Sequence, residues 1–330
     1  GLRAVSVTES AATNPQQPHF FSSLEHNSSH PLAILILQIF CIMITARVFG
    51  SLMTTIGQPS VIGEIIAGII LGPSLMGFVF PGFSQFLFPE DSLLKLHVLS
   101  QIGLVLFMFI IGMELDIGVV RKKAQAAVII SHSSIIFPYF LGVLLAYFLY
   151  PYFAPVRIPF SAFALFMGIA MSITAFPVLA RIVQERNLAN TPIVTIIITF
   201  SSADDITAWC LLALVAAIVS SGGVISVIGS IVMSVFYVMF MMFVARPILH
   251  RLAVKYDTPE SISKTVVAVV FGMLLFSSYL TEVIGIHALF GAFVAGLIMP
   301  PQKVLKRVLS EKIEDISLVL LLPLFFVFTG

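Results

Sequence analysis

The chain has 330 residues, of which 59% are hydrophobic and only 10% are charged, and its mean hydropathy is +1.08. Soluble domains carry about 25% charged residues, so a chain this apolar is predicted to keep much of its surface in lipid. The net charge of +1 gives no indication of a nucleic-acid partner. Cys41 and Cys210 both lie inside apolar runs, which predicts neither a disulfide framework nor a metal site.

The first segment, residues 1–30, is polar and lacks the apolar core of a signal peptide. We expect a polar tail on the extracytoplasmic side of the membrane. Because the chain starts with Gly1 rather than Met, we also expect it to be a processed or trimmed product.

Ten apolar segments follow that are long enough to cross about 30 Å of hydrocarbon at about 1.5 Å per helical residue. Their continuous apolar character predicts an all-α polytopic membrane protein. The segments are approximately 31–50, 58–79, 93–115, 124–150, 158–182, 190–219, 222–246, 262–281, 284–300 and 313–330.

The loops between these segments predict the topology. With the N-terminus outside, 14 of the 17 lysines and arginines fall on the inner side, and only Arg3, Lys95 and Arg157 fall outside. Cytoplasmic loops are enriched in basic residues, so this asymmetry favours an extracytoplasmic N-terminus and an integral, multi-pass protein.

Two pairs of segments resemble each other. Residues 63–71, "GEIIAGIIL", match residues 291–299, "GAFVAGLIM", and "IGLVLFMFIIG" from Ile102 matches "ISLVLLLPLFF" from Ile316. The copies are the second and ninth spans and the third and tenth spans, an offset of seven, which is odd, so the copies have opposite orientations. This pattern is typical of the inverted repeats of secondary transporters.

The repeat also predicts the domain organisation. We expect one transmembrane domain over 31–330, with a first repeat over about 31–219, a linker helix over about 222–246 and a partial second repeat over about 262–330. A complete second repeat needs six helices, so about three further helices are expected after Gly330.

Asp204 and Asp205 are the clearest candidates for chemistry, because they lie near the middle of an apolar run. An uncompensated Asp at the bilayer centre costs about 2.5–3.5 kcal/mol on insertion scales. A carboxylate there can hold either a proton or a metal cation, and this competition alone yields exchange. Consecutive helix positions differ by about 100°, so one carboxylate can face a cavity while the other packs against a neighbouring helix. Ser201, about one turn earlier, can line the same site.

The preceding span contains a predicted helix break. Pro177 has no N–H and its ring clashes with the carbonyl four residues back, that of Ile173. Backbone carbonyls freed at the break, together with the Thr174 hydroxyl, are oxygen ligands at membrane depth.

Among the other polar residues inside the apolar segments, one is kept as a candidate site residue without a clear role. Glu64 is a candidate ion-path residue, and a helix-packing or gate-lining role is an equal alternative. No nucleotide-binding loop, HExxH motif or Ser-His-Asp constellation occurs, so an enzyme is not expected.

Six motifs together resemble the monovalent cation:proton antiporter-2 family, which includes KefC-like bacterial proteins and plant CHX-type exchangers. They are "GQPSVIGEIIAGIILGPSLMG", "LVLFMFIIGMELD", "SITAFPVLARI", "SSADDITAWCLLA", "GIHALFGAFVAGLIMP" and "LPLFFVFTG". The resemblance covers nearly all of residues 31–330.

The resemblance implies a thirteen-helix inverted-repeat fold, of which about ten helices are present, with a discontinuous crossing helix. It implies a homodimer that works by an elevator-like shift of its core, with no cofactor beyond the transported ions. The second residue of the acidic pair, Asp205, is implied to carry the cation or proton, next to Asp204, and the Thr-Ala of the broken helix maps to Thr174 and Ala175.

These observations favour a secondary transporter that exchanges a monovalent cation for protons. Relatives of this kind favour K⁺ over Na⁺ as the expected cation and the bacterial inner membrane as the location. A cation channel and an ion-binding regulatory membrane protein are the alternatives, and saturable counterflow would separate a carrier from a channel.

Overall fold

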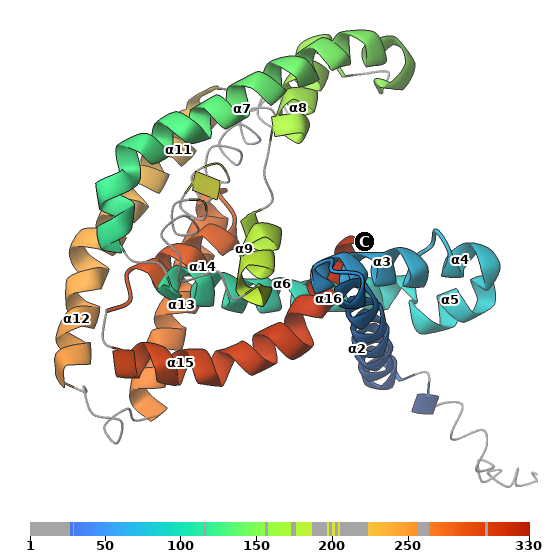
Figure 1. Cartoon of the computed structure of the whole chain (residues 1–330), viewed down its shortest axis with the longest axis horizontal. Helices are drawn as coiled ribbons and strands as arrows, with labels where there is room; N and C mark the ends of the chain where they lie inside the picture. Colours follow the sequence, from blue (N-terminus) through green and yellow to red (C-terminus); the bar gives the residue numbers. More distant parts are fainter. Residues whose placement is uncertain are drawn as a thin grey trace, which may run out of the picture.

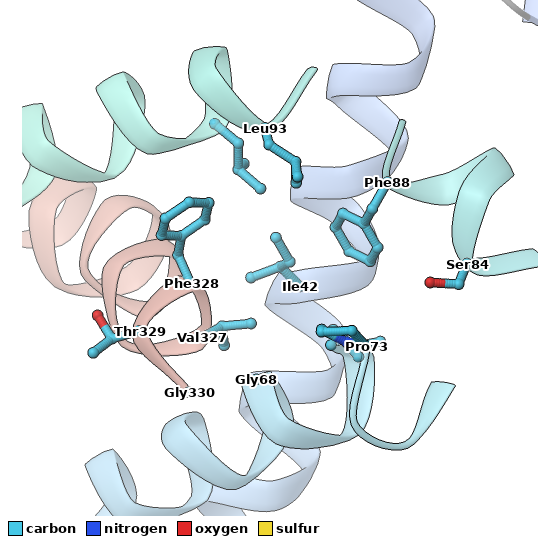
Figure 2. A pocket seen from close by; sticks show the side chains of 13 residues that line it. Ile42, Gly68, Pro73, Ser84, Phe88, Leu93, Val327, Phe328, Thr329 and Gly330 are labelled. Carbon is cyan, nitrogen blue, oxygen red and sulfur yellow. The ribbon is translucent and has the colours of Figure 1, made fainter. Parts of the chain in front are cut away.

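The computed structural model describes residues 27–28, 30–114, 117–155, 158–172, 176–186, 197, 200–201, 204, 224–255, 264–300 and 303–330 (Figure 1). Within these ranges all regular structure is helical, as the composition predicted. The helices are α2 (Pro31–Thr55), α3 (Ser60–Leu71), α4 (Met76–Val79), α5 (Pro81–Leu87), α6 (Glu90–Glu114), α7 (Ile117–Phe153), α8 (Phe160–Ser172), α9 (Phe176–Glu185), α11 (Val224–Phe240), η1 (Met241–Ala245), α12 (Arg246–Lys255), α13 (Lys264–Ile284), α14 (Ala288–Leu297), α15 (Lys303–Asp315), η3 (Ile316–Leu321) and α16 (Leu322–Thr329).

Seven helical segments in the described ranges are long and apolar enough to cross a membrane. They coincide with seven of the ten predicted spans, so the chain is an all-α polytopic membrane protein. The predicted span 284–300 contains a shorter apolar helix, α14, and the span 313–330 is built from η3 and α16. The span 190–219 lies almost entirely outside the described residues, so the total of ten stays a prediction.

Helix α6 forms the centre of the molecule. Its side chains Phe107, Phe109 and Ile110 are fully buried, because α14 packs on one part of the helix and η3 and α16 pack on another. By contrast, α2 and α7 expose large apolar side chains such as Phe40 and Phe148. In a membrane protein such apolar surface faces lipid. In Figure 1, α6 runs through the middle, α2 to α5 lie at one end, and α7 and α8 lie away from them.

Two short π-helices, η1 and η3, each lie directly before a proline-containing helix. Pro247 and Pro323 cannot donate to the carbonyls four residues back, those of Phe243 and Val319, which lie inside the π-helices. A proline ring clashes with that carbonyl in a regular α-helix. Widening one turn to π geometry accommodates the ring without breaking the helix.

The two segments that resemble each other form matching hairpins, α2–α3 and α13–α14. The turn of each hairpin contains a glycine in the left-handed region, Gly57 at φ 81° and Gly285 at φ 94°. Residues with a side chain rarely adopt this conformation. The similarity found at residues 63–71 and 291–299 therefore extends back to the turns.

The helices of each hairpin approach at equivalent glycines. Any side chain at Gly63 would overlap the carbonyl of Phe49 on α2, and any side chain at Gly291 would overlap the carbonyl of Ser277 on α13. Each crossing therefore has a helix backbone in direct contact with a glycine, the geometry that small residues allow in membranes.

The outer face of each hairpin also crosses its neighbour at a glycine. Gly68 on α3 abuts the Val327 carbonyl on α16, and Gly296 on α14 abuts the Phe109 carbonyl on α6. Helix α6 packs on α14 at the position where α16 packs on α3. Such equivalent contacts are expected when two copies of one unit are related by a two-fold axis.

The contacts correct the alignment of the second pair of segments. A side chain at Gly112 would meet the Phe293 carbonyl, and one at Gly330 would meet the Ile65 carbonyl, so Gly112 corresponds to Gly330. The alignment that began with Ile102 on Ile316 is wrong by one helical turn. Runs of leucine and phenylalanine fit each other in several registers, and only the glycine contacts select one.

Candidate functional site

The helix break is predicted at residues 173–176, and residues 173–175 lie outside the described part of the chain, so the break stays a prediction. Helix α8 is described up to Ser172 and α9 from Phe176, which makes Pro177 the second described residue of α9. Thr174 and Ala175 lie between the two helices and outside the described residues, so their predicted roles stay predictions.

Asp204 is buried, with 5% of its surface exposed, although it lies in one of the apolar segments. The Ser134 hydroxyl on α7 donates to Oδ2 of Asp204 at 3.4 Å. Ser201, also helical and buried, lies one turn before Asp204, and its hydroxyl has no hydrogen-bond partner among the described residues. Asp205 lies outside the described residues.

Ser134 is a site residue that the sequence reasoning missed. The signal was present as a polar run at 131–134, "SHSS", inside the apolar segment 124–150. A polar run of this kind in a membrane helix needs a polar partner or water. Its partner on another helix, 70 residues away, could not be read from the sequence.

The arrangement around Asp204 has a defined chemical capacity. A carboxylate oxygen and two hydroxyl groups offer hard oxygen ligands, which alkali and alkaline-earth cations prefer over nitrogen or sulfur. The same carboxylate accepts a proton when the cation is absent. In the described part of the chain, no group of three or more His, Cys, Asp or Glu side chains could hold a metal ion by itself.

Glu64 on α3 is also buried, and it forms an ion pair with Arg181 on α9. Nη2 of Arg181 lies 3.6 Å from Oε1 of Glu64, and 11% and 6% of the two side chains are exposed. Oε2 of Glu64 and Nε of Arg181 have no hydrogen-bond partner among the described residues. The sequence identified Glu64 as a candidate ion-path residue but treated Arg181 as an inner-side cation, and did not pair them.

The family model for the transmembrane domain of sodium/hydrogen exchangers matches residues 34–330. Together with the helical architecture and the buried carboxylates, this match defines the class of the protein as a polytopic ion transporter. The chain belongs to the sodium/hydrogen exchanger family, whose members are cation:proton antiporters rather than enzymes.

Curated relatives give more detail. The chain is 39% identical over 303 residues to "Na(+)/H(+) antiporter NhaS4" of Synechocystis sp. (strain ATCC 27184 / PCC 6803 / Kazusa), covering 92% of this chain and 74% of the relative. It is 37% identical over 307 residues to "Cation/H(+) antiporter 17" of Arabidopsis thaliana, covering 93% of this chain and 37% of the relative. It is 30% identical over 314 residues to "K(+)/H(+) antiporter 1" of Saccharomyces cerevisiae (strain ATCC 204508 / S288c), covering 92% of this chain and 36% of the relative. The chain thus spans little more than a third of the plant and yeast relatives.

Proposed function

We propose that this chain carries the ion-exchanging part of a secondary transporter that moves a monovalent cation and protons in opposite directions by alternating access. The burial of Asp204 in an apolar segment, against the Ser134 hydroxyl of another helix, carries the proposal. A buried acidic group in a membrane is energetically costly, so its presence there indicates a functional site.

The proposed mechanism is competition for the acidic pair. Asp205 binds either the cation or the proton, and Asp204, Ser201 and Ser134 provide the polar surroundings. Thr174 and the carbonyls at the break before Pro177 supply further oxygen ligands. Because both ions need the same carboxylate, each leaves before the other binds, and exchange follows without a separate coupling device.

The test uses the full-length protein, reconstituted in liposomes that contain a pH-sensitive dye. An imposed pH gradient should collapse when K⁺ or Na⁺ is added and persist with choline. Asp205→Asn is expected to insert and fold normally yet to abolish exchange, because asparagine cannot carry the proton.

Asp204→Asn is the matched variant, since it removes the neighbouring charge at the same depth. We expect it to keep measurable exchange if Asp205 is the carrier. Full exchange by Asp205→Asn would remove Asp205 from the mechanism. Flux that does not saturate with cation concentration would favour a channel instead.

K⁺ is the cation we propose from the resemblance, although relatives bear both Na⁺ and K⁺ names. Half-maximal concentrations for the two cations, measured in the same liposomes, decide between them. The homodimer, the extracytoplasmic N-terminus and the bacterial inner membrane belong to the same proposal. Cross-linking in native membranes and labelling of single cysteines from each side test them.

A further inference from the structure

Helix α9 is attached to the hairpin α2–α3 by a set of polar contacts that the proposed site does not use. Besides the Arg181–Glu64 ion pair, Glu185 accepts hydrogen bonds from the backbone N–H of Ser60 at 2.8 Å and from its hydroxyl at 2.9 Å. Nη2 of Arg186 donates to the Gly57 carbonyl. Three consecutive parts of the hairpin are therefore in contact with α9 or with Arg186, the residue directly after it: the turn, the start of α3 and the next turn of α3.

In each of these contacts a charged side chain meets a group of opposite charge or opposite partial charge. The Glu185 carboxylate faces the N-terminus of α3, where backbone N–H groups lack partners and the helix dipole is positive. Arg186 faces a carbonyl, and Arg181 faces a carboxylate. Arg47 on α2 is also close enough to act electrostatically on Glu64.

The second hairpin shows that the glycine crossings do not require these charges. At the position equivalent to Glu64 the second hairpin has Ala292, and at the position equivalent to Ser60 it has Ala288. The N-terminus of α14 is capped within its own hairpin, because Glu282 accepts from the Ala288 N–H at 2.7 Å. The buried charge of Glu64 is therefore specific to the hairpin that contacts α9.

A buried ion pair adds little net stability compared with apolar packing, whereas breaking one by removing a single partner is costly. An alanine in place of Glu64 would suit the crossing, as Ala292 does in the other hairpin. The pair thus has a role other than holding the hairpin together. Its partner Arg181 lies one helical turn after Pro177, on the helix that follows the predicted break.

Helix α9 is also held from the opposite copy of the repeat. Nε2 of Gln184 donates to Oε1 of Glu314 on α15 at 3.2 Å. The end of α9 consequently lies between the two copies, with polar contacts to α3 on one side and to α15 on the other.

We propose that Glu64 is a positioning residue for cation exchange, and not an ion ligand: through Arg181 it holds α9, the helix that follows the predicted break, in its working position against α3. The proposal rests on the exchange activity proposed above. Under this proposal Glu64 is not part of the ion path, and together with Arg181 it connects hairpin α2–α3 to helix α9.

The test measures exchange at varied cation concentration for Glu64→Ala, Arg181→Ala and the double variant. Each single variant is expected to lower the maximal rate about tenfold, with little change in the half-maximal cation concentration, because neither residue contacts the ion. The double variant is expected to lose no more than the worse single variant, since it leaves no unpaired buried charge. Glu64→Asp should keep more of the rate than Glu64→Gln.

Glu282→Gln is the matched control, because it changes a carboxylate that caps α14 without contacting α9, and its rate should equal that of the unaltered protein. Losses that multiply to about a hundredfold in the double variant would overturn the pairing. A raised half-maximal cation concentration in Glu64→Gln, with an unchanged value in Arg181→Ala, would indicate that Glu64 contacts the ion, and would overturn the proposal.

A readout independent of transport keeps this proposal separate from the proposed function. The unfolding temperatures of the four proteins in detergent should also be non-additive, whether or not the protein exchanges any cation. Additive shifts in unfolding temperature would contradict the proposed coupling between Glu64 and Arg181. Absence of exchange in the unaltered protein, with coupled unfolding temperatures, would overturn the proposed function while keeping the pair.

Discussion

The hairpins α2–α3 and α13–α14 share their shape and differ in their attachments. Both turn at a left-handed glycine, and both bring their helices together where a glycine meets a carbonyl. The first is attached to α9 by charged groups, whereas the second is attached to α11 by the hydroxyls of Tyr237 and Ser277, 2.5 Å apart. The glycines therefore determine the scaffold, and the polar groups that surround it are free to diverge between the two copies.

The differing attachments also fit the composition of each neighbourhood. Ser277 donates to the Gly291 carbonyl at 2.7 Å, so a neutral hydroxyl lies at the crossing of the second hairpin. The first hairpin has Phe49 where the second has Ser277, and its polar contacts come from outside the hairpin. The second hairpin thus contacts α11 through neutral hydroxyls, whereas the first contacts α9 through charged groups.

The largest expected effect comes from filling the equivalent outer crossings. Gly68→Ala and Gly296→Ala should each destabilise the protein by about 3 kcal/mol or more, because the new methyl group would overlap a backbone carbonyl that has no room to move. Unfolding temperature in detergent measures the effect. Gly272→Ala on α13 is the control: outside the helix's own backbone no atom lies within 4 Å of the added methyl group, so the change should be neutral or slightly stabilising. Very unequal losses at Gly68 and Gly296 would break the equivalence of the two copies.

A smaller effect is expected at the turns. Gly57→Ala and Gly285→Ala should each cost about 1–2 kcal/mol, the penalty of a left-handed conformation for a residue with a side chain. Space does not limit these substitutions. Apart from the neighbouring residues of the chain, no atom lies within 4 Å of a methyl group added at Gly57, and only the Ser230 hydroxyl oxygen, at 3.9 Å, lies near one added at Gly285. The same thermal measurement applies, and Gly82→Ala, in open space without a left-handed φ, supplies the comparison. Unchanged stability at both turns would argue against the shared turn geometry.

The smallest effect is expected where the hairpins differ. Tyr237→Phe removes one hydroxyl from the buried pair with Ser277, which still donates to Gly291. Hydrogen bonds between membrane helices contribute about 0.6 kcal/mol on average, so a shift of this size in unfolding free energy is expected. Tyr279→Phe changes an exposed tyrosine on α13, the helix that carries Ser277, and should have no effect. A loss of several kcal/mol would mean that α11 is essential to the second hairpin.

Much of the architecture could be predicted because hydropathy reports on each helix alone. Seven predicted spans coincide with long apolar helices of the structure. The register of the second repeated segment could not be predicted, because its apolar residues are interchangeable. Only the contacts of Gly112 and Gly330 distinguish one register from the next.

The candidate site was predictable in part for a related reason. A carboxylate in an apolar run stands out in any sequence, so Asp204 and Glu64 were identified before their surroundings were known. Their partners Ser134 and Arg181 were not identified as such. They lie 70 and 117 positions away, and nothing in their own segments marks which carboxylate they meet.

The sequence by itself determined that this protein lives in lipid, where its helices run and which family it belongs to, because burial in a bilayer is decided segment by segment from side-chain polarity. The tertiary structure alone decided which glycine meets which carbonyl and which acidic group meets which base. Those choices depend on close approach between helices far apart in the chain, where a single methyl group or an unpaired charge determines whether two helices can pack.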